Sequence, residues 1–324
     1  MKTNRPAASI SLDLDNVWSY MKTHGDEGWQ DYPSYLDPLI DIVLDRLKRH
    51  GLRITIFIVG KDASLEKNAA ALARIAQAGH DIGSHSFSHE PWFHIYPPEK
   101  VEEEIRVAEE HIERVTGHRP KGYRGPGFSL TPETLRVLSR RGYVYDASTF
   151  PTFLGPIARA YYFFQSKNLT KSEQEDRHQL FGSAKEGFRA LRPYLWRVAG
   201  GAGEILEIPV TTMPLARVPI HMSYILFLGM RSITVAMTYL RAALALCKAR
   251  GIEPSFLLHP LDFLGGDVEK RLNFFPAMTL STEQKLSLLD RVLDELGGSF
   301  ELVDMQTHAE RLLSAGNLKV QDAA

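Results

Sequence analysis

Short apolar runs recur along the chain, and longer segments with one polar and one apolar face separate them. Runs of this length, bounded by turn-forming residues, are typical of buried β-strands. We expect strands over residues 8–14, 53–59, 80–84, 121–124, 143–147, 205–211, 255–259 and 300–303.

The separating segments repeat apolar residues at the spacing of an amphipathic helix. In residues 35–50 the repeat comprises Leu36, Leu39, Ile40, Val43, Leu44 and Leu47. Further helices are expected over 65–78, 99–115, 131–141, 232–250 and 281–296, and Pro132 after Thr131 fits a capped helix start. Strands that alternate with helices predict an α/β fold around a parallel sheet, either open or closed into a barrel.

Residues 151–204 interrupt this alternation. Ten of the chain's 32 aromatic residues lie between Phe150 and Trp196. An insertion that follows a strand of a parallel barrel usually lies over the active face. We interpret this stretch as an aromatic-rich helical insertion, which either packs its own aromatic side chains or contributes to substrate binding.

Composition narrows the class of protein. The 324 residues are 44% hydrophobic and 24% charged, which excludes disordered, collagen-like and coiled-coil proteins. Because the chain has 38 basic and 39 acidic side chains, the formal net charge is only −1. No global positive field would therefore attract nucleic acid, and we expect no nucleic-acid partner.

The single cysteine and the apolar runs bear on the expected compartment. Cys247 alone excludes a disulfide framework and any site with several thiolate ligands. The N-terminal residues lack the apolar core of a secretory signal, and the longest uncharged run, residues 218–230, is too short to span a bilayer. We expect a cytoplasmic protein without a transmembrane segment.

Two acidic residues stand at the end of the first predicted strand. Asp13 and Asp15 are two positions apart, so a regular strand places their side chains on one face. Two buried carboxylates cannot both remain ionised without a cation or a proton between them. A solvated turn at the end of the strand is the alternative interpretation.

A pair of histidines follows the third predicted strand. His85 and His89 can place two imidazoles on one helical face or turn, a spacing that suits a divalent metal. Structural and surface histidines are commoner, so the pair alone is a weak signal. Combined with Asp15 it makes a set of two histidines and one carboxylate, which leaves metal positions open for water and substrate.

Two more candidates stand at strand ends. Arg124 follows a short strand, and an arginine beside two acids would hold one of them ionised and oriented. His259 follows an apolar strand, where a histidine is well placed as a general acid, although a buried core histidine is the alternative.

The order of these motifs resembles the polysaccharide deacetylase family, the carbohydrate esterase group that shares the NodB homology domain. Its first motif, usually Thr-Phe-Asp-Asp-Gly, is here Ser-Leu-Asp-Leu-Asp-Asn, the spaced form of a branch with intracellular peptidoglycan-deacetylase-like and allantoinase-like proteins. The second, third and fifth motifs stand as His85-Ser86-Phe87-Ser88-His89, Arg124-Gly125-Pro126 and Leu257-Leu258-His259.

The resemblance implies one domain over residues 1–324, folded as a distorted (β/α)7-type barrel with the insertion at 151–204. It implies a divalent metal, preferably Zn²⁺ with Co²⁺ or Ni²⁺ as alternatives, held by Asp15, His85 and His89. By the same resemblance Asp13 is the catalytic base, Arg124 positions it, and His259 is the catalytic acid.

Two departures from the family pattern concern single positions. Gly127 stands where an aromatic or bulky residue is often found near the third motif. The Asp and Trp of the fourth motif cannot be placed unless Trp196 belongs to it, so the group that tunes His259 stays open.

The implied reaction is metal-assisted hydrolysis of an amide. The first hypothesis is removal of an N-acetyl or N-formyl group from an amino sugar of a glycan, either free or linked to polyprenyl phosphate. For the linked form, the clusters at residues 161–164 and 193–196, with Arg189, Arg192 and Arg197, would contact the inner face of the membrane. The alternatives are an allantoinase-like amidase on a small non-sugar amide and a non-catalytic glycan-binding module.

Overall fold

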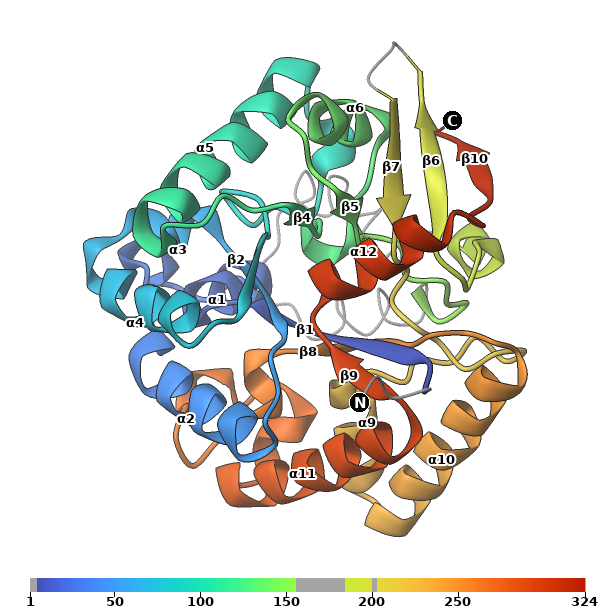
Figure 1. Ribbon diagram of the computed structural model, residues 1–324. Coiled ribbons are helices and arrows are strands. Elements are labelled where there is room, and N and C mark those ends of the chain that lie inside the picture. The colour runs from blue at the N-terminus through green and yellow to red at the C-terminus, as the bar shows by residue number, and fades with distance from the viewer. Residues whose placement is uncertain (1–4, 156–183, 200–202, 324) are drawn as a thin grey trace.

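The computed structural model describes residues 5–155, 184–199 and 203–323. Its strands form one mostly parallel sheet with helices packed around it (Figure 1). The strands are β1 (Ala7–Leu14), β2 (Thr55–Ile58), β3 (Asp81–Ser84), β4 (Gly122–Tyr123), β5 (Tyr145–Asp146), β6 (Tyr194–Val198), β7 (Gly203–Glu207), β8 (Ser255–Leu258), β9 (Glu301–Val303) and β10 (Val320–Asp322). The α/β fold expected from the alternation is confirmed.

The strand order is β10-β6-β7-β5-β4-β3-β2-β1-β8, and β9 pairs with the start of β1. Every pairing is parallel except that of β6 with β7. Among the described residues, the two ends of this order, β10 and β8, are not paired with each other. Just beyond β7, however, the Thr211 N–H donates to the Ser255 carbonyl at 3.1 Å, and the Ser255 N–H donates to the Thr211 hydroxyl at 2.7 Å. The sheet therefore curves back on itself, as a distorted barrel would.

The helices are α1 (Val17–His24), α2 (Leu36–Arg49), α3 (Gly60–Ser64), α4 (Glu66–Gln77), α5 (Pro98–Thr116), α6 (Pro132–Arg140), α9 (Met222–Gly229), α10 (Ile233–Ala249), α11 (Thr282–Ser299) and α12 (Met305–Ala315). Each predicted helix is present, and the Thr131 hydroxyl accepts the Thr134 N–H at the start of α6, as expected for a cap. The helix α9 was not predicted, because its residues are almost uniformly apolar and give no helical period. Among the described residues, no helix has the length and apolar character needed to cross a membrane.

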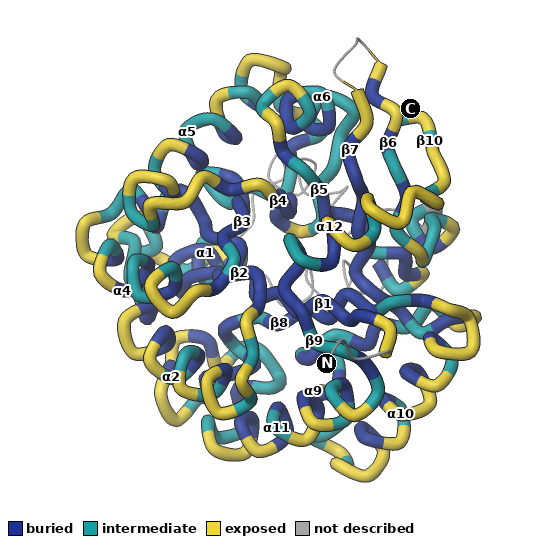
Figure 2. The backbone as a smooth tube through the Cα atoms, viewed as in Figure 1, coloured by how far each residue is buried: buried dark blue, intermediate teal, exposed yellow. Residues whose placement is uncertain are grey.

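The central strands are buried and the outer helix faces are exposed (Figure 2). In β1, Ile10, Leu12 and Leu14 belong to the main apolar core, whereas Ser11 and Asp13 on the other face contact Arg124. This alternation inside a fully buried strand places polar side chains in the interior of the curved sheet.

The expected insertion lies in part outside the described residues, including the cluster at 161–164 and all of residues 156–183. The described part corrects one expectation. Residues 194–198 form strand β6, with Tyr194, Trp196 and Val198 buried, so this segment is not helical. Tyr194 and Trp196 are core residues rather than membrane contacts. The period of two in Tyr-Leu-Trp-Arg-Val was the signal for a strand.

Candidate active site

The predicted site residues gather at the carboxyl ends of neighbouring strands. Leu12 of β1 pairs with Leu258 of β8, so Asp13 and His259 follow at adjacent places in the ladder. Ser84 pairs with both Ile58 and Tyr123 in the same edge of the sheet, which brings His85 and Arg124 to this edge. The structure thus brings together the whole predicted set: Asp13, Asp15, His85, His89, Arg124 and His259.

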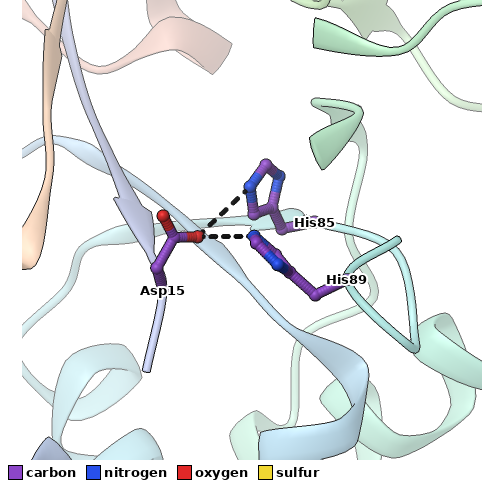
Figure 3. Close-up of side chains that lie close together, drawn as sticks. All are labelled: Asp15, His85 and His89. Carbon is purple, nitrogen blue, oxygen red and sulfur yellow. Dashed lines mark ion pairs between the residues drawn. The ribbon is translucent and has the colours of Figure 1, made fainter. Parts of the chain in front are cut away.

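Asp15, His85 and His89 form a compact cluster (Figure 3). One ligand atom from each residue lies within 4.8 Å of the others. Asp15 Oδ1 is 2.8 Å from Nε2 of His89 and 3.5 Å from Nε2 of His85. Asp15 lies just past β1, and both histidines lie on the loop after β3 rather than on a helix.

This cluster fits a divalent cation. Asp15 Oδ1 is buried and has no well-aligned hydrogen-bond donor among the described residues, although two imidazole nitrogens face it. Burial alone would raise the pKa of Asp15, but His89 and His85 hold it well below its usual range, so the carboxyl is ionised at neutral pH. An anionic oxygen with two imidazole nitrogens is a ligand set that suits zinc and similar metals.

The orientation of His85 is fixed by the backbone. Its Nδ1 lies 2.6 Å from the Arg124 carbonyl oxygen. Because a carbonyl only accepts, Nδ1 must carry a hydrogen, and in the neutral imidazole Nε2 is then the bare nitrogen that faces Asp15 and the cluster. Such a hydrogen bond on the far nitrogen is the usual way in which proteins orient a metal-binding histidine.

A buried carboxylate holds the loop that carries the two histidines. Ser86 and His89 have left-handed backbone conformations, with φ of 59° and 53°, which are costly for residues other than glycine. Glu104 of α5 is 1% exposed and accepts the Ser88 N–H at 2.8 Å, the Ser88 hydroxyl at 2.6 Å and the Phe87 N–H at 3.2 Å. These three hydrogen bonds stabilise the strained loop.

Asp13 is held by Arg124. The Arg124 side chain is fully buried, and its Nη1 donates to Asp13 Oδ1 at 2.7 Å and to the Ser11 hydroxyl at 2.8 Å. Its Nε donates to the Ala147 carbonyl at 2.9 Å, and its guanidinium lies 4.5 Å from the centre of the Phe57 ring. The guanidinium is therefore immobilised, and it fixes the Asp13 carboxylate beside the cluster.

A second buried polar network supports the backbone next to Arg124. The Gly125 N–H donates to the Ser148 hydroxyl at 2.8 Å, and this hydroxyl donates to Asp146 at 2.6 Å. Burial and the neighbouring Asp146 raise the pKa of Glu207 well above its usual range, so this pair shares a proton at neutral pH. In the sequence, Asp146 and Glu207 are recognisable only as parts of predicted strands.

His259 has partners that the sequence analysis did not find. Its Nδ1 lies 3.3 Å from the Ser223 hydroxyl, which donates to Oδ1 of Asp262 at 2.8 Å. Oδ2 of Asp262 accepts the backbone N–H of His259 at 2.7 Å. Asp262 is fully buried just after β8, whereas Ser223 comes from α9, which no helical period revealed.

The two departures from the family pattern have structural explanations. Gly127 has φ of 58°, and a Cβ there would come within 2.9 Å of the Pro91 Cβ, so the loop after His89 occupies the space of a side chain. Trp196 is not beside His259 in any contact of the described residues. Its Nε1 instead donates to Glu207 at 2.9 Å, within the proton-sharing pair.

Comparison with known proteins finds similarity over part of the chain. The model of the polysaccharide deacetylase family matches residues 26–145, which include both histidines and Arg124. This segment of the chain is similar to the polysaccharide deacetylases. Relatives include a peptidoglycan-N-acetylglucosamine deacetylase of Bacillus cereus, 31% identical over 32% of this chain and 36% of that protein. A peptidoglycan deacetylase of Helicobacter pylori is 30% identical over 43% of this chain and 48% of that protein.

The matched segments thus span less than half of the length of these two deacetylases. A solved structure agrees over a longer range. It is a Mycobacterium smegmatis protein described as a candidate polysaccharide deacetylase, with a TM-score of 0.63 and 17% identity, covering 99% of this chain and 94% of that one. At this level of identity the agreement shows a shared fold alone.

Proposed function

We propose that this polysaccharide deacetylase homologue is a metal-dependent hydrolase that removes the N-acetyl group from an amino sugar of a glycan. The observation that carries the proposal is one sheet edge that joins the Asp15, His85 and His89 cluster to an arginine-held carboxylate and a histidine. The activity of the Bacillus cereus and Helicobacter pylori relatives supports a glycan as the substrate.

In this proposal the metal would be held by Asp15, His85 and His89, with Zn²⁺ preferred and Co²⁺ or Ni²⁺ as alternatives. When bound, it would supply a water of lowered pKa and polarise the acyl carbonyl. Asp13 accepts the proton of the attacking water. Arg124 keeps the Asp13 carboxylate oriented toward that water, and the buried contacts of its guanidinium prevent it from swinging away.

The remaining chemistry falls to His259 and to a backbone amide. His259 donates a proton to the nitrogen of the leaving amino sugar, which completes cleavage of the amide to acetate and a free amine. Within residues 124–127, the Arg124 and Gly125 N–H groups already donate to Ser84 and Ser148, and Pro126 has none. We therefore assign stabilisation of the developing oxyanion to the Gly127 N–H.

A glycan linked to polyprenyl phosphate is a narrower form of the same proposal. Its support from the insertion is reduced, because Tyr194 and Trp196 are buried and Arg189 pairs with Glu186. We therefore favour a glycan without a lipid carrier. The name of the Bacillus cereus relative, an N-acetylglucosamine deacetylase, supports an N-acetyl rather than an N-formyl group. No contact of the described residues favours the small non-sugar amide.

The test is release of acetate from N-acetylated chito-oligosaccharides and peptidoglycan fragments, with and without a polyprenyl carrier, by protein loaded with Zn²⁺. The proposal expects acetate and free amine in equal amounts, and loss of both in Asp13→Asn and His259→Gln. Metal-loaded, folded protein that leaves all of these substrates intact would contradict the proposal. Turnover of only the lipid-linked substrate would instead establish the narrower form.

A further inference from the structure

The apolar segment of residues 218–230 lies directly against the proposed catalytic acid. It forms α9, whose first residues place Ser223 within 3.3 Å of His259 Nδ1 and within 2.8 Å of Asp262 Oδ1. His221, at the cap of the same helix, has its ring centre 6.1 Å from that of His259. Neither the motifs nor the mechanism above accounts for Ser223.

The two oxygens of Asp262 determine which way the Ser223 hydroxyl donates. Both oxygens of Asp262 accept a hydrogen bond, one from the His259 N–H and one from the Ser223 hydroxyl. Since the Ser223 hydrogen points to Asp262, the Ser223 oxygen offers a lone pair to His259 Nδ1. The backbone N–H of Asp262 also faces the His259 side chain, in the capping box that these two residues form. When Nδ1 carries a hydrogen, it donates to the Ser223 oxygen, and Nε2 is the nitrogen that takes up and releases the catalytic proton.

We propose that Ser223 is a positioning residue that links the imidazole of His259 to the buried carboxylate of Asp262. The relay selects the tautomer in which Nε2 faces the substrate, and it stabilises the imidazolium form through a polarised hydroxyl. Its effect on turnover rests on the proposed function, whereas its effect on the tautomer of His259 does not.

Neighbouring groups keep the relay in place. Lys285 of α11 is fully buried and donates to the carbonyls of Leu261 and Leu264 at 2.6 and 2.7 Å, so it fixes the turn that carries Asp262. Burial raises the pKa of Asp262, while His259, its hydrogen bonds and Lys285 act in the opposite direction.

Two other titratable groups lie near His259 and Asp262. Tyr20 of α1 interacts electrostatically with Asp262, and burial together with His259 lowers the pKa of His221 to about 3. His221 is therefore neutral at neutral pH. Among the described residues, Lys285 and Asp262 are then the charged groups beside the relay. Of these two, Asp262 is the one hydrogen-bonded to Ser223.

The first experiment measures the pH dependence of kcat/KM for wild type, Ser223→Ala and Ser223→Thr, each with its metal content determined. We expect Ser223→Ala to lower kcat about tenfold or more with KM and metal content unchanged, and to move the alkaline limb to lower pH by about one unit. Ser223→Thr, which keeps the hydroxyl, should restore most of kcat. A wild-type kcat and pH profile in Ser223→Ala would overturn the proposal.

The second experiment needs no substrate. Nitrogen-15 NMR of the imidazole side chains reports which nitrogen of His259 carries hydrogen, with His259→Gln used to assign the signal. We expect the Nδ1–H tautomer in neutral His259 of the wild type and a shift toward the Nε2–H tautomer in Ser223→Ala. A predominant Nε2–H tautomer in the wild type would mean that Nδ1 accepts from Ser223 or from the Asp262 N–H, and would overturn the relay. An inactive protein with the expected tautomers would refute the proposed function and leave the relay standing.

Discussion

The two halves of the candidate site are built in different ways. The metal half consists of Asp13, Asp15 and the loop from His85 to His89, all in short motifs at the ends of neighbouring strands. The acid half joins His259 to Ser223 and Asp262, and Lys285 from a later helix fixes the turn. Ser223 and Lys285 lie outside the short motifs at the strand ends.

The difference lies in what orients each reactive side chain. In the metal half, backbone groups and direct ion pairs do so, as in the contacts of His85 with the Arg124 carbonyl and of Arg124 with Asp13. In the acid half, a side-chain hydroxyl stands between the imidazole and the carboxylate. We infer that substitutions in the metal half change metal content or the base, whereas substitutions in the acid half change protonation alone.

The largest effect is expected for His85→Ala. Removing one of three ligands from the cluster should abolish stoichiometric metal binding and with it all turnover, because the site relies on every protein ligand. Elemental mass spectrometry of wild type and variant measures the metal per chain. His118→Ala, at an exposed histidine, is the control for loss of an imidazole. Equal metal content in His85→Ala and wild type would exclude His85 as a ligand.

The next effect separates the base from the ligands. Asp13→Asn should lower kcat by about 10²–10⁴-fold while metal content stays at the wild-type level, because Asp13 contacts Arg124 rather than joining the cluster. Since the substitution leaves a buried guanidinium without its carboxylate, unfolding in urea must show that the variant is folded under assay conditions. Loss of metal and activity together would refute the division of roles between Asp13 and Asp15.

A smaller effect is expected at Glu104, which is hydrogen-bonded to the loop that carries His85 and His89. Glu104→Gln removes the negative charge that accepts three hydrogen bonds from the loop and should weaken metal affinity about 10–100-fold. Competition with a chelator measures the affinity, and the visible spectrum of the Co²⁺-loaded protein reports ligand geometry. Glu103→Gln is the matched control, because Glu103 is the neighbouring acid on α5 and its side chain is 55% exposed. An unchanged affinity in Glu104→Gln would show that the loop keeps its shape without this carboxylate.

The same contrast explains how much the sequence could predict. The sequence could predict that Asp13, Asp15, His85, His89 and Arg124 lie together, because each stands at the end of a recognisable strand and parallel strands bring their carboxyl ends to one edge. The alternation of elements likewise predicted the sheet and most helices.

Ser223 and Asp262 could not be found in this way. Ser223 lies in a helix whose residues are nearly all apolar, so the sequence shows no period that would orient it. Its contact with His259 depends on how α9 packs against β8, which is a tertiary property. Asp262 stands three positions after His259, and only the turn that brings its carboxylate back to the His259 N–H reveals its role.

The smallest expected effect concerns the free energy of unfolding rather than turnover. It tests whether His221, beside His259, is uncharged. The pKa of His221 is lowered to about 3 from an ordinary 6.5, first by burial and then by His259. Between pH 6.5 and 3, His221 is protonated in the unfolded chain but stays neutral in the folded protein. Proton binding therefore favours the unfolded chain, and the contribution of His221 to stability falls as the pH drops from 6.5 toward 3. At pH 5 the loss should be about 1–2 kcal/mol, and His221→Asn should remove it.

Urea unfolding at pH 7.5 and at pH 5.0 measures this difference in the free energy of unfolding. Asparagine suits the cap position of α9, so the variant should retain the helix. His118→Asn should leave the pH dependence as in the wild type, because this exposed side chain is in water in both states. A His221→Asn variant with the wild-type pH dependence would show that His221 accepts a proton without cost beside His259. The acid half would then carry a second positive charge near neutral pH, and protonation there could not be assigned to His259 alone.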